Sequence, residues 1–164
     1  MTKISKQTIY VETSIISYFT AIQSRDILIF ARQQITQDWW NDVLPKFEAF
    51  ISPAVIEEIS DGDRQASQLR LKAASSFKVL EINNEVINLT QKILKKFSFP
   101  DRAKSDALHI AFPVVHKIDY LVTWNCKHIA NAFTLKMIEK LILDNGYQMP
   151  TITTPNEFME DPNE

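Results

Sequence analysis

The side chains with the clearest chemical potential are three carboxylates and one carboxamide that lie far apart in the chain. They are Glu12, Glu58, Asp106 and Asn125, and each follows a predicted strand or lies on a predicted helix. Divalent cations such as Mg²⁺ bind oxygen ligands of this kind, and separate elements can supply them one at a time. A cation held in this way polarises a phosphate and activates water. We therefore predict a metal site that hydrolyses phosphodiester bonds.

Each acid also has a plain structural explanation. Glu12 could be a solvated residue at a strand end. Glu57 and Glu58 are adjacent on a predicted helix, so one of them points outward, and the spacing from Ser52 favours Glu58 as the inward residue. Asp106 could cap a helix, since acids stabilise helix N-termini by about 0.3–1 kcal/mol. Its helix is strongly apolar, which favours a position facing a pocket.

Strands and helices alternate along the predicted chain. The predicted strands cover residues 8–11, 47–51, 78–82, 119–123 and 151–153. A short helix follows Glu12, and further helices are predicted for residues 24–45, 54–60, 66–75, 85–96, 100–116 and 132–143. This alternation predicts an α/β domain with a mostly parallel central sheet flanked by helices. Ligands bind outside the carboxyl ends of strands in such sheets, where Glu12 and Asn125 would lie.

The helix predicted for residues 24–45 has one apolar face. Its apolar residues at gaps of three and four are Leu28, Ala31, Ile35, Trp39 and Val43. Trp39 and Trp40 are adjacent, so only one of them can face the core. The other is a candidate for an interface, where tryptophan is enriched.

Composition places limits on the class of protein. The chain has 164 residues, 45% of them hydrophobic, which fits one domain at residues 1–153, followed by an acidic C-terminal tail at 154–164. One cysteine, Cys126, excludes an internal disulfide, and no apolar run is long enough for a membrane span or a signal peptide. We therefore expect a cytoplasmic protein with no membrane contact. The net charge is −2, but all 18 basic residues lie in residues 1–140, which carry +3, so RNA binding is permitted.

Four segments in order resemble the PIN-domain nucleases, and within them the VapC-type toxins. The segments are Ile9–Ser14 with Glu12-Thr13-Ser14, Ser52–Gly62 with Glu58, Asp106–Ala111, and Thr123-Trp124-Asn125. The family usually has Asp at the first position and often at the last, where this chain has Glu12 and Asn125. The resemblance implies a PIN-like fold and a ribonuclease that uses Mg²⁺ or Mn²⁺. It also implies a homodimer and a cognate antitoxin partner, for which the surface near Trp40 is a candidate site.

We assign roles to the site residues on this basis. Glu12, Glu58 and Asp106 are predicted to hold the metal ion, and Asn125 to orient a metal-bound water or the phosphate. Thr13 and Thr123 are predicted to position the acids from behind. Ser14 and Lys127 are predicted to contact substrate, and the predicted basic cluster beside the site is Lys92, Lys95, Lys96, Arg102 and Lys104.

His109 follows Asp106 by one helical turn, and we predict that it is a hydrogen-bonded core residue rather than a catalyst. Zinc is discounted because His128 and Cys126 have no neighbouring ligands of the same kind. Two other functions stay open. One is a PIN-like module that binds RNA or protein with weak or no catalysis. The other is a small phosphatase, which would need an Asp nucleophile where this chain has Glu12-Thr13-Ser14.

Overall fold

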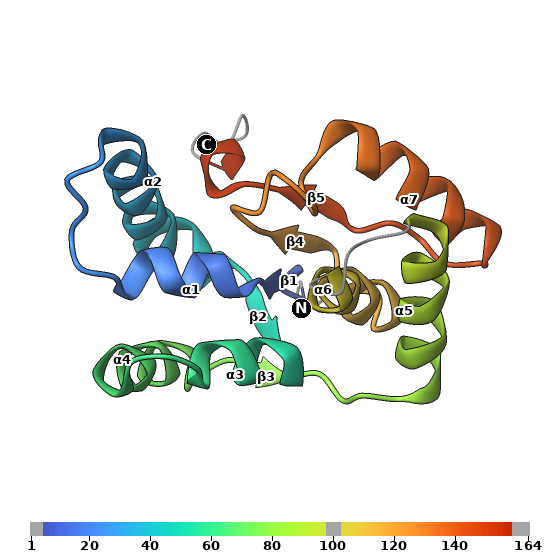
Figure 1. Ribbon diagram of the computed structural model, residues 1–164, viewed down its shortest axis with the longest axis horizontal. Coiled ribbons are helices and arrows are strands. Elements are labelled where there is room, and N and C mark those ends of the chain that lie inside the picture. The colour runs from blue at the N-terminus through green and yellow to red at the C-terminus, as the bar shows by residue number, and fades with distance from the viewer. Residues whose placement is uncertain (1–4, 98–102, 159–164) are drawn as a thin grey trace.

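The computed structural model describes residues 5–97 and 103–158, and it contains one five-stranded sheet (Figure 1). The strands are β1 (Thr8–Val11), β2 (Glu48–Ile51), β3 (Lys78–Val79), β4 (Tyr120–Val122) and β5 (Thr151–Thr153). Their order is β3-β2-β1-β4-β5, and each neighbouring pair is parallel. The predicted α/β class is confirmed, and β3 is shorter than the predicted 78–82.

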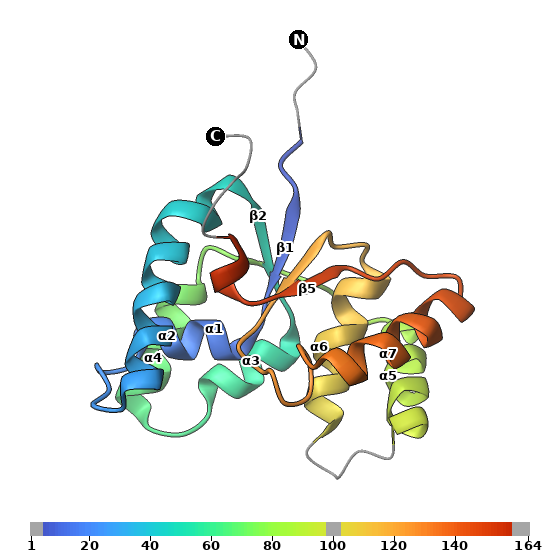
Figure 2. The ribbon, with the colours of Figure 1, turned by 90° about the horizontal axis from the view of Figure 1, so that it is seen from above.

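Helices cover both sides of this sheet (Figure 2). On one side lie α1 (Thr13–Thr20), α2 (Ile27–Asp38) and α4 (Arg64–Ala74), and on the other lie α5 (Asn84–Phe97), α6 (Ala103–Val115) and α7 (Ala132–Asp144). α3 (Pro53–Ser60) contacts α1, α4 and α6. The first residues of the helix predicted from residue 100 lie outside the described residues. None of the described helices is long and apolar enough to cross a bilayer.

β1 is the central strand, and it is buried on both faces. Ile9 and Tyr10 are 0% exposed, as expected for a parallel strand that is covered by helices on both sides. Tyr10 pairs with Phe50 of β2 and with Leu121 of β4. Because β1 lies between these strands, Glu12 leaves the sheet at its middle.

The prediction of one continuous helix over residues 24–45 is wrong. α2 begins after Asp26, whose carboxylate accepts from the backbone N–H groups of the first turn, and ends at Asp38. A π-helical turn at Trp39–Val43 and a 3₁₀ turn at Leu44–Lys46 follow. The helical period of the polypeptide therefore changes twice between α2 and β2.

The predicted apolar face is correct only in its second half, where Trp39 is buried and Ile35 and Val43 pack against the core. Leu28 is 61% exposed, whereas the buried residues of α2 are the polar Gln33 and Thr36. Gln33 accepts a hydrogen bond from Ser24 N at 2.9 Å and donates to Ile22 O at 3.0 Å. These bonds to the preceding loop set the rotation of α2, and apolar spacing does not reveal them.

The two tryptophans after α2 differ as expected. Trp39 is 0% exposed, whereas Trp40 is half-buried and stacks on Phe19 at 4.0 Å between ring centroids. The ring of Trp40 also lies 5.4 Å from that of Phe77. Trp40 thus joins the region after α2 to α1 and to the segment before β3.

Packing continues beyond β5. Pro155–Phe158 form a 3₁₀ turn, and the Phe158 ring lies 6.3 Å from Trp39, 5.7 Å from Phe47 and 5.5 Å from Tyr120. The packed part of the domain therefore extends to Phe158 rather than to residue 153, because an aromatic residue that we assigned to the tail completes an aromatic cluster. Residues 159–164 of the predicted tail lie outside the described residues.

Candidate active site

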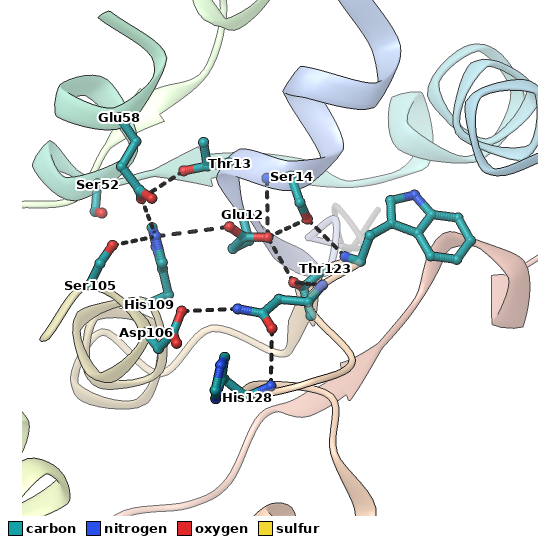
Figure 3. Close-up of polar contacts among 12 residues, drawn as sticks. Glu12, Thr13, Ser14, Ser52, Glu58, Ser105, Asp106, His109, Thr123 and His128 are labelled. Carbon is teal, nitrogen blue, oxygen red and sulfur yellow. Dashed lines mark hydrogen bonds and ion pairs between the residues drawn. The ribbon is translucent and has the colours of Figure 1, made fainter. Parts of the chain in front are cut away.

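Glu12 lies at the carboxyl end of β1 and is 4% exposed. Its Oε2 accepts hydrogen bonds from Thr123 Oγ1 at 2.7 Å, from Ser14 N at 3.1 Å and from Ser14 Oγ (Figure 3). The bond from Ser14 N caps α1. A buried carboxylate needs such donors. Glu12 is therefore an inward-facing residue and not a solvated strand end.

Glu58 reaches the same region from α3. Its Oε1 accepts a hydrogen bond from Thr13 Oγ1 at 3.0 Å and contacts His109 Nε2 (Figure 3). The side chain of Glu58 is 38% exposed, so it stands at the edge of the site, and the choice of Glu58 over Glu57 as the inward residue agrees with these contacts.

Asp106 lies in the first turn of α6 and is bound to Asn125. Asn125 Nδ2 donates to Asp106 Oδ1 at 2.9 Å, and Asn125 Oδ1 accepts from His128 N at 3.0 Å. Thr123 Oγ1 accepts from Asn125 N at 2.9 Å while donating to Glu12. The carboxamide thus joins the loop after β4 to α6.

His109 is the residue whose position the sequence did not reveal. It is 1% exposed, and its Nε2 contacts Glu58 Oε1 and lies 3.9 Å from Glu12 Oε1 (Figure 3). On the other side of the ring, Nδ1 lies 2.8 Å from Tyr10 Oη. The prediction of a buried, hydrogen-bonded histidine is confirmed, but its partners are the carboxylates of the candidate site.

Opposing effects set the pKa values of the charged groups here. Burial acts to raise the pKa of Glu58, but the hydrogen bond and charge of His109 and the bond from Thr13 outweigh it, so the pKa lies below its ordinary value. Burial acts to lower the pKa of His109, and Glu58, Glu12 and Asp106 together raise it above the ordinary value.

Asp106 behaves in the opposite way to Glu58. Burial raises the pKa of Asp106, and the charges of Glu12 and Glu58 raise it further, against the lowering by His128 and His109. Three carboxylates in one region therefore repel each other, which a cation would relieve.

The remaining predicted residues occupy distinct positions. Thr13 and Thr123 donate to Glu58 and Glu12 respectively, as expected for positioning residues. The Ser14 hydroxyl donates to Glu12 and accepts from Trp124 N at 2.9 Å, so it already has two partners. Lys127 is exposed on the loop after Asn125.

The donor chemistry of the three carboxylates fits a divalent cation. Each group uses one oxygen for the hydrogen bonds above, and a carboxylate has about four acceptor positions, so each keeps capacity for a cation. Within residues 5–97 and 103–158, no three such side chains are already arranged around one point. His109 Nε2 lies between Glu12 and Glu58. The ligand types therefore fit, and the carboxylates must draw together to bind an ion.

Nine chains of solved structures match this chain, among them the following two. The VapBC-1 structure from nontypeable Haemophilus influenzae matches with a TM-score of 0.56 and 15% identity over 92% of this chain and 99% of that one. The VapBC2 structure from Rickettsia felis, bound to a DNA fragment from their promoter, matches with a TM-score of 0.53 and 13% identity over 90% and 98% of the two chains. The chain shares the fold of these structures, an α/β domain with a parallel five-stranded sheet, and the predicted PIN-like fold is confirmed. No protein-family model and no curated protein matches its sequence.

Glu58 also lines a hollow on the surface. The hollow has a volume of about 820 Å³, and its lining includes the acidic Glu57 and Asp61 as well as Ser60, Lys104, Ser105 and Leu108. Ser105 Oγ also lies 3.3 Å from His109 Nε2. Of the predicted basic cluster, Lys104 is therefore the member that lines the hollow, and Arg102 lies outside the described residues.

Proposed function

We propose that the chain is a metal-dependent endoribonuclease that hydrolyses RNA phosphodiester bonds. The observation that carries this proposal is that Glu12, Glu58 and Asp106 lie in one region beyond the carboxyl end of β1 although they come from three separate elements (Figure 3). His109 links Glu12 to Glu58, and Thr123 and Asn125 link Glu12 to Asp106. Each carboxylate is held on one oxygen by a named donor, as metal-ligating carboxylates usually are. The PIN-like fold also supports a nuclease, but only by analogy between folds.

Glu12, Glu58 and Asp106 would hold Mg²⁺ or Mn²⁺ in this site. The ion would supply Lewis acidity at the phosphate and a more acidic water. Thr123 and Thr13 keep Glu12 and Glu58 turned inward, so the carboxylates do not rotate into solvent. Asn125 Nδ2 donates a hydrogen bond that fixes the carboxylate of Asp106, and Asn125 Oδ1 accepts a hydrogen bond from His128 N.

Lys104 and Lys127 provide positive charge near the site for the RNA backbone. Lys104 lines the hollow beside Glu58, and Lys127 is exposed two residues after Asn125. Phosphate contacts by lysine give affinity without sequence preference.

We further propose a VapC-type toxin that pairs with a cognate antitoxin and forms a homodimer in the cytoplasm. Support comes from the likeness to the VapBC structures and from apolar side chains that are exposed near α2: Ile22 at 93%, Ile27 at 84% and Leu28 at 61%. Exposed apolar patches of this kind mark protein interfaces.

The deciding experiment compares the wild type with Asp106→Asn on a pool of structured RNA in Mg²⁺, Mn²⁺ or EDTA. We expect cleavage in metal only and a loss on the order of 100-fold or more in the variant, since even residues that only support metal ligands change activity about 10–100-fold. Asp144→Asn, an exposed carboxylate on α7, is the matched control and should cut normally.

One observation favours the alternative of a PIN-like binding module with weak or no catalysis. Within residues 5–97 and 103–158, no three carboxylates are arranged around one point, so the ligands are not yet in place for an ion. RNA binding by the wild type without cleavage at saturating Mg²⁺ and Mn²⁺ would support that module. Cleavage that persists in both EDTA and Asp106→Asn would exclude this site as the source of activity.

A further inference from the structure

A continuous polar chain runs through the buried centre of the domain and ends at Glu58. Ser52 Oγ lies 2.7 Å from Tyr10 Oη, Tyr10 Oη lies 2.8 Å from His109 Nδ1, and His109 Nε2 contacts Glu58 Oε1. Ser52 and Tyr10 are 0% exposed, and His109 is 1% exposed. Three buried polar side chains therefore form one hydrogen-bonded chain that ends at the carboxylate of Glu58, at the edge of the site.

Ser52 departs from its usual local role to take part in this chain. It occupies the N-cap position of α3, where a serine hydroxyl normally accepts from a backbone N–H. Its side chain makes no such bond and turns to Tyr10 instead. The helix therefore forgoes a stabilising cap so that the Tyr10 hydroxyl has a partner on each side.

The chain determines what His109 offers to Glu58. An ionised carboxylate only accepts hydrogen bonds, so Nε2 must carry the hydrogen in either ring form. Nδ1 is then an acceptor in the neutral ring or a donor in the charged ring, and the Tyr10 hydroxyl serves both. The Ser52 hydroxyl can likewise either donate to or accept from the Tyr10 hydroxyl, so the hydrogen bonds of the chain are satisfied in both ring forms. The ring is thus fixed in place by Tyr10 with its Nε2–H directed at Glu58.

Glu58 needs this support more than Glu12 does. Its side chain is 38% exposed, whereas Glu12 is 4% exposed and accepts from Thr123 and Ser14. A flexible glutamate at a rim has several rotamers that point into solvent. Thr13 and His109 contact Oε1 and hold the carboxylate toward the site, and Ser105 is a further hydrogen-bond partner of Glu58.

We propose that His109 is a positioning residue for Glu58, and that Tyr10 and Ser52 act through it to build one ligand of the metal site. This inference rests on the proposed function for the identity of the ligand, and it assigns His109 no proton transfer.

The first test measures Mn²⁺ binding to the full chain by calorimetry. We expect His109→Leu to weaken Mn²⁺ binding about 10-fold or more, and His109→Gln, which keeps an N–H at the Nε2 position, to recover most of that loss. Tyr10→Phe should weaken binding severalfold, whereas Tyr120→Phe, the same change at the start of β4, should leave it unaltered. A His109→Gln protein that binds Mn²⁺ like the wild type but has lost RNA cleavage would overturn the proposal in favour of proton transfer by His109.

The second test needs no metal and no activity. Urea unfolding in EDTA compares Tyr10→Phe, Glu58→Gln and the double variant, because residues that act through one chain are not additive. We expect the double variant to unfold at nearly the midpoint of the less stable single variant. Fully additive shifts would sink the inference even if the chain cuts RNA. Non-additive shifts in a chain that neither binds Mn²⁺ nor cuts RNA would retain the positioning of Glu58 and reject the proposed nuclease.

Discussion

The hydroxyl of Ser14 accepts a 2.9 Å hydrogen bond from the backbone N–H of Trp124. The same hydroxyl donates to Glu12 Oε2. Ser14 therefore connects the first turn of α1 to the loop after β4, with the carboxylate of Glu12 between them. We predicted from the sequence that Ser14 contacts substrate. Its hydrogen bonds to Glu12 and Trp124 also give it a structural role, which can be measured as a change in stability.

Ser14→Ala should lower the free energy of unfolding by about 1–3 kcal/mol, because the Trp124 N–H then loses its partner in a partly buried position. Chemical denaturation measures this change. Ser60→Ala, at an exposed position of α3, is the control and should stay within about 0.5 kcal/mol. An unchanged stability together with a higher KM for RNA would instead assign Ser14 to the substrate.

Removal of Glu58 should change stability in a pH-dependent way in metal-free protein. The pKa of Glu58 is lowered from 4.5, so its contribution is present above pH 4.5 and is lost as the pH falls through the folded value. The pKa of His109 is raised from 6.5, so its contribution is complete below pH 6.5 and is lost as the pH rises through the folded value. Wild type and Glu58→Gln should therefore differ most between pH 4.5 and 6.5.

Denaturation in EDTA from pH 3 to 9 checks this window. A difference between the two proteins that does not vary with pH would contradict the ion pair of Glu58 and His109.

Phe158→Ala should destabilise the domain by about 2–4 kcal/mol, since the ring packs against Trp39, Phe47 and Tyr120. Phe133 is 83% exposed on α7 and provides a matched control with the same chemical change. Thermal unfolding of both variants separates the two cases. Equal, small effects would mean that the turn after β5 adds nothing to the core.

Lys127→Ala should raise the KM for RNA about 2–5-fold with little change in kcat, because a phosphate contact by an exposed lysine gives affinity only. The dependence of log KM on log salt should lose about one unit of slope. Lys140→Ala, on α7 beside Asp144, should behave like the wild type. A fall in kcat at constant KM would place Lys127 in the chemical step instead.

The parts of the fold that follow from local pattern were predictable. The β-branched and aromatic run before Glu12 predicts a buried strand, and the alternation of strands and helices predicts a parallel sheet with acids at its carboxyl end. The apolar residues that follow Asp106 on its helix likewise predict that this carboxylate faces the site. These signals depend on neighbours within a few residues, which a sequence displays directly.

The rest depends on side chains that meet across long separations. A histidine on an apolar helix has the same local pattern whether it bonds a carbonyl or, as His109 does, a glutamate 51 residues away. Gln33 is a good helix former that looks solvent-exposed until its bonds to Ser24 and Ile22 are seen. In the sequence, Phe158 follows mostly polar residues and looks like part of a solvated tail. Its aromatic partners in the structure come from three other segments of the chain.

The order of the strands has a consequence for how the molecule is made. Glu12 is synthesised early, but its donor Thr123 lies 111 residues further on, and β1 has one free edge until β4 exists. A nascent chain therefore cannot assemble the three carboxylates around a stable β1 until Thr123 and β4 have left the ribosome. If the chain cuts RNA, the site that does so forms only after these 111 further residues have been synthesised.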